Sequence, residues 1–239
     1  MSEKKTAMVI SAHTADFVWR AGGAVALYAE RGWEVTVVCL SFGERGESAK
    51  LWRQPGMTME KVKANRTEEA RRAAEILGAK LILFDVGDYP MRVPDNVLFE
   101  LAGLFRKIRP EFILTHSLKD PYNFDHPLAT HITQEARIVA QAHGHEPGTP
   151  VIGAPPVFLF EPHQPEQCEF KPQVLLDITP VWAKKHAAFR EMVAQEHLWE
   201  YYERAALQRG VQATRNSNLK IKYAEAYQRV FPQVTEVLA

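Results

Sequence analysis

The stretch Thr6-Ala-Met-Val-Ile-Ser-Ala-His13-Thr-Ala-Asp16 decides the fold. It begins as a short apolar run and stops abruptly at a histidine, with a carboxylate three residues later. Such a run, bounded by polar residues, is typical of a buried β-strand. Since an open α/β sheet places its ligand crevice at the carboxyl ends of its strands, His13 and Asp16 are expected to project into that crevice.

The rest of the first half alternates between short apolar runs and longer amphipathic ones, the pattern of βαβ units with parallel strands. Gly32 and Gly78 follow two of the amphipathic runs and supply helix stops. We predict a single domain over residues 1–239, with a Rossmann-like, mostly parallel sheet and helices on both faces. The predicted strands are 7–11, 34–40, 80–84, 112–115, 157–160 and 174–176, and the predicted helices are 19–31, 59–77, 95–107, 127–142, 180–202 and one near 223–229.

Composition argues against several classes of partner. Lys and Arg total 29, as do Asp and Glu, so no overall charge indicates a nucleic acid or a membrane surface as partner. The two cysteines, Cys39 and Cys168, have no C-x-x-C spacing, which argues against a disulfide scaffold and a thiolate zinc site. We expect a cytoplasmic protein, because the sequence shows neither a signal-peptide core nor an apolar run of transmembrane length. The long C-terminal helices carry Trp and Tyr, which is compatible with a homo-oligomer.

A second segment offers metal ligands. Asn123-Phe-Asp125-His126 follows the apolar run that ends at His116. Two histidines and one carboxylate would leave a coordination position open for water or substrate, as catalytic zinc sites do. The competing interpretation of Asp16 is a capping residue of the following helix.

Two further loops follow predicted strands. Ser41-Phe-Gly-Glu44-Arg45-Gly-Glu47-Ser48 is either a solvated turn or a source of a general acid or base. Phe160-Glu-Pro-His163-Gln-Pro holds a histidine between two prolines on stiff backbone. His163 is therefore either a structural loop residue or a functional group, as a general acid or as a partner of an oxyanion. Arg45 is the best-placed arginine for an anionic substrate.

These residues resemble the PIG-L/LmbE-like zinc deacetylase superfamily. The resemblance rests on Ala12-His13-Thr-Ala-Asp16, the Gly43–46 loop, Arg66-x-x-Glu69, Asn123-Phe-Asp-His126 and Asp177-Ile-Thr, and it runs through most of the chain. It implies that His13, Asp16 and His126 hold one Zn²⁺. Imidazole and carboxylate also suit other divalent ions, so the residues alone do not fix the metal.

Two positions depart from the deacetylase pattern. Ala15 stands where the resemblance implies the aspartate that acts as general base, and Asn123 stands where it implies a histidine that stabilises an oxyanion. Losing a general base costs roughly a hundredfold to ten-thousandfold in rate. Ordinary amide hydrolysis is therefore not expected, although the metal ligands remain.

The strings 41–48, 120–128 and 160–168 closely resemble a hydratase branch of this superfamily that serves bacterial gallate and protocatechuate breakdown. This resemblance implies addition of water to a carbon–carbon double bond of a small tricarboxylate. In that reaction we expect Glu47 and His163 to handle protons, in either assignment. Arg45, His116 and Asn123 are expected to bind substrate carboxylates. The rivals are a zinc deacetylase of a small amide or amino sugar, with Glu47 or Asp125 as substitute base, and a non-enzymatic binding protein.

Overall fold

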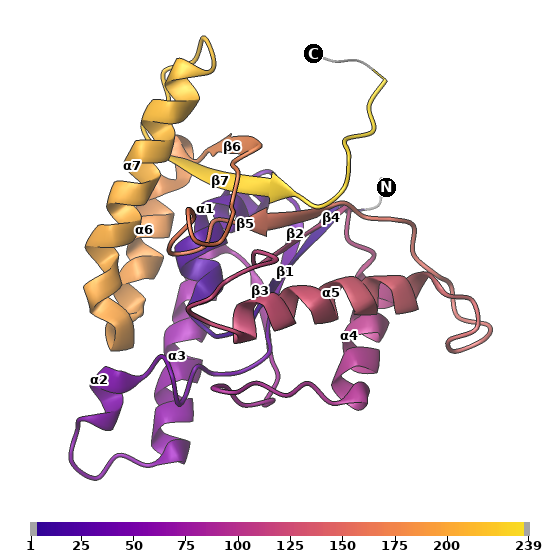
Figure 1. Ribbon diagram of the computed structural model, residues 1–239, viewed down its shortest axis with the longest axis horizontal. Coiled ribbons are helices and arrows are strands. Elements are labelled where there is room, and N and C mark those ends of the chain that lie inside the picture. The colour runs from indigo at the N-terminus through magenta and orange to yellow at the C-terminus, as the bar shows by residue number, and fades with distance from the viewer. Residues whose placement is uncertain (1–3, 237–239) are drawn as a thin grey trace.

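The computed structural model describes residues 4–236 and is built around one seven-stranded sheet, in the order β3-β2-β1-β4-β5-β7-β6 (Figure 1). The first five of these strands are mutually parallel, and β7 runs antiparallel to both of its neighbours. The predicted fold class, a mostly parallel Rossmann-like sheet, is confirmed. The strands are β1 (Thr6–Ser11), β2 (Glu34–Cys39), β3 (Lys80–Leu83), β4 (Phe112–Thr115), β5 (Val157–Phe160), β6 (Val174–Asp177) and β7 (Ala224–Arg229).

Helices cover both faces of the sheet, as β1 illustrates. Val9 packs into one hydrophobic cluster, while Met8 and Ile10 pack into the other, because successive side chains of a strand point to opposite faces. α1 (Asp16–Glu30), α3 (Met59–Leu77), α6 (Trp182–Glu191) and α7 (Trp199–Arg215) contribute to the first cluster, and α4 (Asp95–Ile108) and α5 (Asp125–Gln141) to the second (Figure 1). A sheet buried on both faces explains why its central strands β1, β4 and β5 are almost uninterruptedly apolar.

Local signals define the helix ends well in the first half. The Thr58 side chain accepts a hydrogen bond from the Lys61 N–H at the start of α3. Gly78 ends the same helix with a φ of 79°, a left-handed conformation that glycine adopts without steric cost. The short helix α2 (Ala49–Trp52) is an element that the sequence reasoning missed.

The prediction of one helix over 180–202 is wrong. A 3₁₀ turn, η1 (Thr179–Val181), precedes α6, and a second, η2 (Val193–Leu198), separates α6 from α7. Gln195 within η2 has a non-helical backbone, with φ −125° and ψ 33°. Its side chain bonds to Arg66 on α3, so a tertiary contact sets the break.

The prediction of a helix near 223–229 is also wrong, because this segment is β7. Glu225 and Tyr227 lie two positions apart on one face of the strand, and the Tyr227 hydroxyl donates to Glu225 over 2.6 Å. Glu225 also accepts from Lys185 and from the N–H groups of Gly23 and Ala24. These partners lie far away in sequence, so a local helical period could not reveal them.

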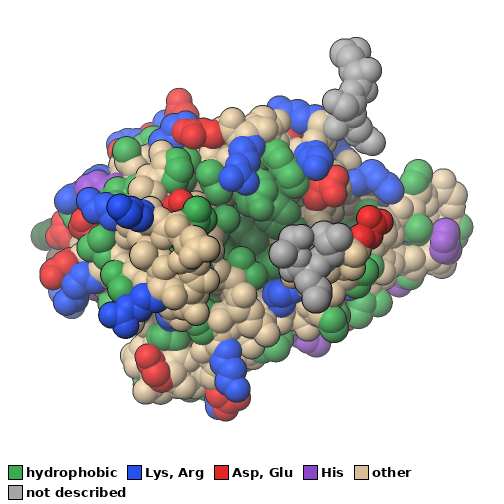
Figure 2. All heavy atoms as spheres, turned by 90° about the horizontal axis from the view of Figure 1, so that it is seen from above, with side chains coloured by type: hydrophobic (Ala, Val, Ile, Leu, Met, Phe, Trp, Pro, Cys, Tyr) green, Lys and Arg blue, Asp and Glu red, His purple; other side chains and the backbone are tan. Residues whose placement is uncertain are grey.

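Acidic and basic side chains are mixed on the face seen in Figure 2, around a hollow lined with hydrophobic side chains. The mixture agrees with the net charge of zero. Within residues 4–236, none of the helices combines the length and the apolar character needed to cross a lipid bilayer.

Candidate metal centre

His13 and Asp16 lie at the carboxyl end of β1. His13 is in the loop after the strand, and Asp16 is the first residue of α1. Ala15 cannot cap this helix with its side chain, and the Asp16 carboxylate instead turns back to accept the His13 N–H over 2.9 Å. A carboxylate is favourable here because the helix N-terminus carries partial positive charge. The turn brings Asp16 Oδ2 to 3.1 Å from His13 Nδ1.

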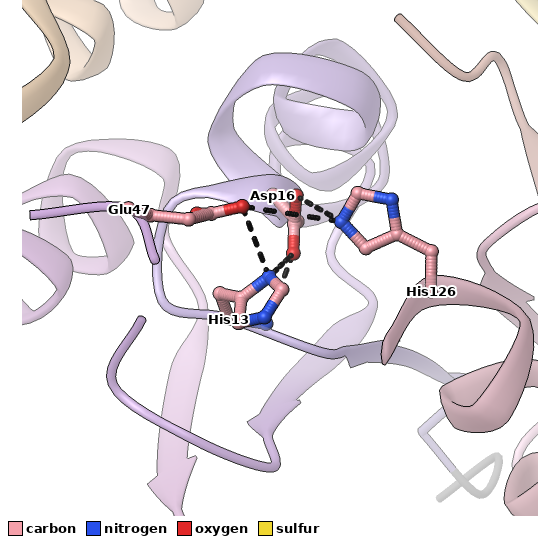
Figure 3. Close-up of side chains that lie close together, drawn as sticks. All are labelled: His13, Asp16, Glu47 and His126. Carbon is pink, nitrogen blue, oxygen red and sulfur yellow. Dashed lines mark hydrogen bonds and ion pairs between the residues drawn. The ribbon is translucent and has the colours of Figure 1, made fainter. Parts of the chain in front are cut away.

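Two other loops complete the cluster. His126 is the second residue of α5, and its Nε2 lies 3.5 Å from Asp16 Oδ1. Glu47, in the loop after β2, places Oε1 3.1 Å from His13 Nδ1 and 4.0 Å from His126 Nε2. One ligand atom from each of these four residues lies within 4.8 Å of the others, and the side chains converge on a common centre (Figure 3).

Each histidine of the cluster is oriented by a carboxylate on its far side. Asp125 Oδ2 lies 3.2 Å from His13 Nε2, and Asp120 Oδ2 lies 2.8 Å from His126 Nδ1. Metal-binding histidines almost always donate their second ring N–H to such a group, which fixes the tautomer. The nitrogens left over, His13 Nδ1 and His126 Nε2, are the ones that face the cluster.

The charges of the cluster fit a cation. Burial alone would raise the pKa of Asp16, but the neighbouring imidazoles of His116 and His126 hold it well below its ordinary value. Burial also opposes ionisation of Glu47, yet the charge of His13 and a hydrogen bond to it lower the pKa of Glu47. Two ionised carboxylates and two imidazoles in a buried site are a suitable donor set for Zn²⁺ or a similar divalent ion.

The two departures from the deacetylase pattern lie at this centre. Ala15 is completely buried and offers no side-chain acceptor. Asn123 Nδ2 lies 3.1 Å from His126 Nε2, and Asn123 Oδ1 accepts the N–H of Asp125. Asn123 therefore lies beside a nitrogen that faces the cluster, and it can donate a hydrogen bond but carries no charge.

A chain of two hydrogen bonds, through Gln195 to Arg66, positions Glu47, and the sequence did not predict it. Gln195 Nε2 donates to Glu47 Oε2 over 3.5 Å, and Gln195 Oε1 accepts from Arg66 over 3.0 Å. Arg66 is fully buried and also donates to Glu69 and to the Phe42 carbonyl. The Arg66-x-x-Glu69 motif thus supports the loop that carries Glu47, while nothing local in the sequence marks Gln195.

The remaining predicted residues lie around the cluster rather than in it. Within residues 4–236, no hydrogen bond or ion pair joins Arg45 or His163 to the four clustered residues. The half-exposed guanidinium of Arg45 donates to the Asp88 carbonyl over 3.0 Å. His163 stacks on Tyr201 with ring centroids 4.0 Å apart, and its carbonyl accepts from the Tyr201 hydroxyl.

His116 is completely buried. Its Nε2 accepts the N–H of Ala12 over 2.9 Å, and its ring stacks on His126 at a centroid distance of 4.2 Å. Burial, followed by the charge of His126, lowers the pKa of His116 well below its ordinary value. In this position a neutral His116 supports the ring of His126.

A cleft of about 640 Å³ opens beside Glu47 and brings in residues that the sequence reasoning missed. Its lining includes Tyr89, Lys50, Arg53, Gln195 and His197. The ring of Tyr89 lies 6.0 Å from the ring of His13, centroid to centroid. The signal that could have identified Tyr89 is its place in the loop after β3, at the carboxyl edge of the sheet.

The family profile described as "PIG-L: GlcNAc-PI de-N-acetylase" matches residues 8–137, more than half of the chain. The chain belongs to the PIG-L family. The matched residues include His13, Asp16, Glu47 and His126, all four members of the cluster.

Relatives within and around the PIG-L family differ in their reported chemistry. A protein of Pseudomonas putida KT2440 named "4-oxalmesaconate hydratase" is 65% identical, over 99% of this chain and 93% of that protein. The "Diacetylchitobiose deacetylase" of Thermococcus kodakarensis is 27% identical, over 84% of this chain and 75% of that protein.

Solved structures agree with the fold. The crystal structure of GalB, the 4-carboxy-2-hydroxymuconate hydratase of P. putida KT2440, superposes with a TM-score of 0.96 at 65% identity, covering 98% of this chain and all of that one. The N,N′-diacetylchitobiose deacetylase of Pyrococcus horikoshii superposes with a TM-score of 0.79 at 21% identity, covering 95% of this chain and 84% of that one. The second comparison shows that a deacetylase shares this PIG-L fold.

Proposed function

We propose that the protein is a zinc-dependent hydratase in gallate and protocatechuate degradation. It would add water to the carbon–carbon double bond of 4-oxalomesaconate, whose enol tautomer is 4-carboxy-2-hydroxymuconate, to give 4-carboxy-4-hydroxy-2-oxoadipate. The observation that carries this proposal is the 65% identity, over 99% of the chain, to a protein named for that activity. The loss of the deacetylase base at Ala15 agrees with it.

We propose that His13, Asp16 and His126 hold one Zn²⁺ per chain, with Glu47 close enough to be a further ligand or a neighbouring base. The bound ion would act as a Lewis acid toward the oxo-acid end of the substrate. Support comes from the two carboxylates, Asp125 and Asp120, that orient the histidine rings.

The protein's own groups would move the protons. Hydration places a hydroxyl on the carbon that bears the extra carboxylate and a proton on the neighbouring carbon. Glu47 is suited to accept the proton of the attacking water, because its lowered pKa keeps it ionised near neutral pH. His163 would then deliver the proton that is added to the neighbouring carbon. The roles of Glu47 and His163 could also be reversed, and the pH profile of a His163 variant distinguishes the two assignments.

A trianionic substrate needs compensating charge and hydrogen-bond donors. We propose Arg45, with its half-exposed guanidinium, and Asn123, beside His126, as carboxylate-binding groups. His116 was predicted to share this role. Its burial and its bond to Ala12 favour a supporting role instead.

We also propose that the chain works as one domain over 1–239, in the cytoplasm, on a small-molecule substrate, without nucleic acid or membrane as a partner and as a homo-oligomer. The continuous seven-stranded sheet supports the first of these statements, and the neutral charge supports the absence of a polyanionic partner.

The decisive experiment follows the ultraviolet absorbance of the conjugated tricarboxylate on adding the purified protein, with and without prior chelation. We expect the absorbance to fall, the rate to be abolished by chelation, and Zn²⁺ to restore it. An unchanged absorbance with fully metal-loaded protein would refute the proposal. Activity that survives complete metal removal would refute its zinc dependence.

The alternative function is deacetylation of a small amide or amino sugar, which the family match and the shared fold favour. Asp125, one candidate for the substitute base, faces His13 Nε2 and accepts the N–H groups of Tyr89 and Met91, so it is not free to activate water. Acetate release from N-acetylglucosamine derivatives, with no change in muconate absorbance, would establish this alternative. Metal binding without either activity would indicate a binding protein.

A further inference from the structure

Arg20 is a buried cation whose hydrogen-bonding groups lack partners. The residue is 7% exposed, and within residues 4–236 neither Nε nor Nη1 has a hydrogen-bond partner. Asp16 Oδ1 forms an ion pair with Arg20 at 3.6 Å from Nε, which is beyond hydrogen-bond distance. A guanidinium cannot lose its proton to escape this situation, so buried N–H groups that have an ion-pair neighbour but no hydrogen-bond partner require an explanation.

The other buried cations of the protein show the contrast. Lys185 donates to Glu225 over 2.5 Å. Arg66 donates to Glu69, to Gln195 and to the Phe42 carbonyl. Both of these buried cations donate hydrogen bonds to acceptors of the protein, whereas Arg20 Nε and Nη1 do not.

Arg20 lies beside Asp16 of the candidate metal centre and beside the loop that carries His163. It is on α1, one helical turn after Asp16, and it lines a small cleft with Glu161, Pro162, Tyr201 and Tyr202. Burial lowers the pKa of His163, and the positive charge of Arg20 lowers it further. Burial opposes the charge of Arg20 itself, but Tyr202, Asp16, Asp120 and Glu47 raise its pKa, so it stays a cation facing both groups.

The two carboxylates that share this cleft already have partners. Glu225 accepts from Lys185, from Tyr227 and from the N–H groups of Gly23 and Ala24. Glu161 accepts from Arg209 Nε over 2.9 and 3.1 Å and accepts a further bond from Arg209 Nη2. Neither Glu161 nor Glu225 is therefore the missing partner of Arg20. The polar groups of Arg20 remain available to an anion that enters beside the metal centre and the loop of His163.

We propose that Arg20 binds a carboxylate of the substrate and selects for a tricarboxylate over a dicarboxylate. This inference rests on the proposed function, because the substrate would lie beside the metal centre and His163. The planar fork of arginine matches a carboxylate with two parallel hydrogen bonds, which lysine cannot reproduce. Arg20 thereby joins Arg45 as a substrate-binding residue, and it lies closer to the metal centre.

Isothermal titration of zinc-loaded protein with an unreactive probe tests this inference without turnover. The probes are propane-1,2,3-tricarboxylate and propane-1,3-dicarboxylate, which differ by one carboxylate. The wild type should bind the tricarboxylate about 10 to 100 times more tightly, the range for charge-assisted hydrogen bonds. R20M should lose this preference, R20K should keep part of it, and the exposed-arginine control R71M, on α3, should match the wild type.

Zinc affinity, measured by chelator competition, separates this role from a structural one. If Arg20 only compensates the charge of Asp16, R20M should change zinc affinity and leave tricarboxylate affinity unchanged, and the inference fails. Equal probe affinities in the wild type also overturn it. If circular dichroism shows that R20M does not fold, R20K alone tests the inference. Its preference for the tricarboxylate should then lie between that of the wild type and no preference, and a preference equal to that of the wild type would contradict the inference.

The failures of the two proposals are distinguishable. Absent turnover in the zinc-loaded wild type counts against the hydratase, whereas unchanged tricarboxylate affinity in a folded Arg20 variant counts against this inference alone.

Discussion

His13 Nε2 lies 3.2 Å from Asp125 Oδ2, although the two residues are 112 positions apart in the chain. Asp125 is fixed in turn by the N–H groups of Tyr89 and Met91, at 3.0 and 2.9 Å. The loops after β1, β3 and β4 thus meet at one carboxylate. This carboxylate orients His13 so that Nδ1 faces the candidate metal centre.

Replacing Asp125 by Asn should weaken metal binding. Loss of a carboxylate that orients a metal-binding histidine typically costs about 10- to 100-fold in metal affinity. Chelator competition with zinc measures the change, and D95N, on the exposed start of α4, is the matched control. Equal zinc affinity in D125N and D95N would contradict this assignment of Asp125.

Metal binding should release a proton. In the metal-free protein burial alone would lower the pKa of His13, but the charge of Glu47 and hydrogen bonds to Asp125, Asp16 and Glu47 raise it well above its ordinary value. His13 is then protonated at pH 7, and a metal must displace that proton, so about one proton should leave per zinc bound.

Calorimetry in buffers of different ionisation enthalpy counts this proton. Because the pKa is raised, zinc affinity should fall as the pH decreases, by about tenfold per pH unit below that pKa. H13A, which has no imidazole, is the control for the proton count. If the wild type releases no proton per zinc bound between pH 6 and 8, zinc does not displace a proton from His13.

Glu47→Gln should lower kcat by about 10² to 10⁴, the usual contribution of a general base. Zinc affinity then separates two roles of Glu47. A base alone leaves zinc affinity unchanged, whereas a ligand lowers it as well. E100Q, an exposed glutamate on α4, controls for the change of charge. Turnover at the wild-type rate in E47Q would exclude both roles.

His163→Gln should reveal which proton His163 moves. Burial, then the charge of Arg20, holds the pKa of His163 below 6.5. A base with this pKa makes kcat/KM rise with pH below 6.5 and level off near neutrality, whereas an acid makes it fall through the same range. The pH profile, recorded with excess zinc, should lose this limb in H163Q. Superimposable profiles would remove His163 from the reaction.

Gly210→Ala tests the packing of α7 against the segment that leads into β7. A Cβ at Gly210 would lie 2.1 Å from the Lys222 carbonyl oxygen, so backbone must shift. We expect a loss of about 1–3 kcal/mol in the free energy of unfolding. Gly103 on α4 has open space, and G103A should instead gain up to about 1 kcal/mol from helix propensity. Urea unfolding measures both variants, and equal shifts would contradict the contact.

Local pattern was sufficient to predict that His13, Asp16 and His126 come together at one edge of the sheet. The apolar runs before His13 and before the 123–126 segment predicted two parallel strands, and parallel strands bring their carboxyl ends to one edge. The predicted strands 112–115 and 157–160 match β4 and β5 residue for residue. This success has a simple cause, because a strand buried on both faces carries its signal in its own residues.

Only the tertiary structure decided how the side chains face one another. The sequence by itself determined a parallel sheet with imidazoles and carboxylates at one edge, but not that Asp125 turns away from the centre while Glu47 turns toward it. Those directions depend on partners such as Gln195, which is 148 positions from Glu47. The same dependence explains the two errors, the break at Gln195 and the strand β7. Contacts between distant segments override local propensity wherever they bury or satisfy more groups than the local conformation does.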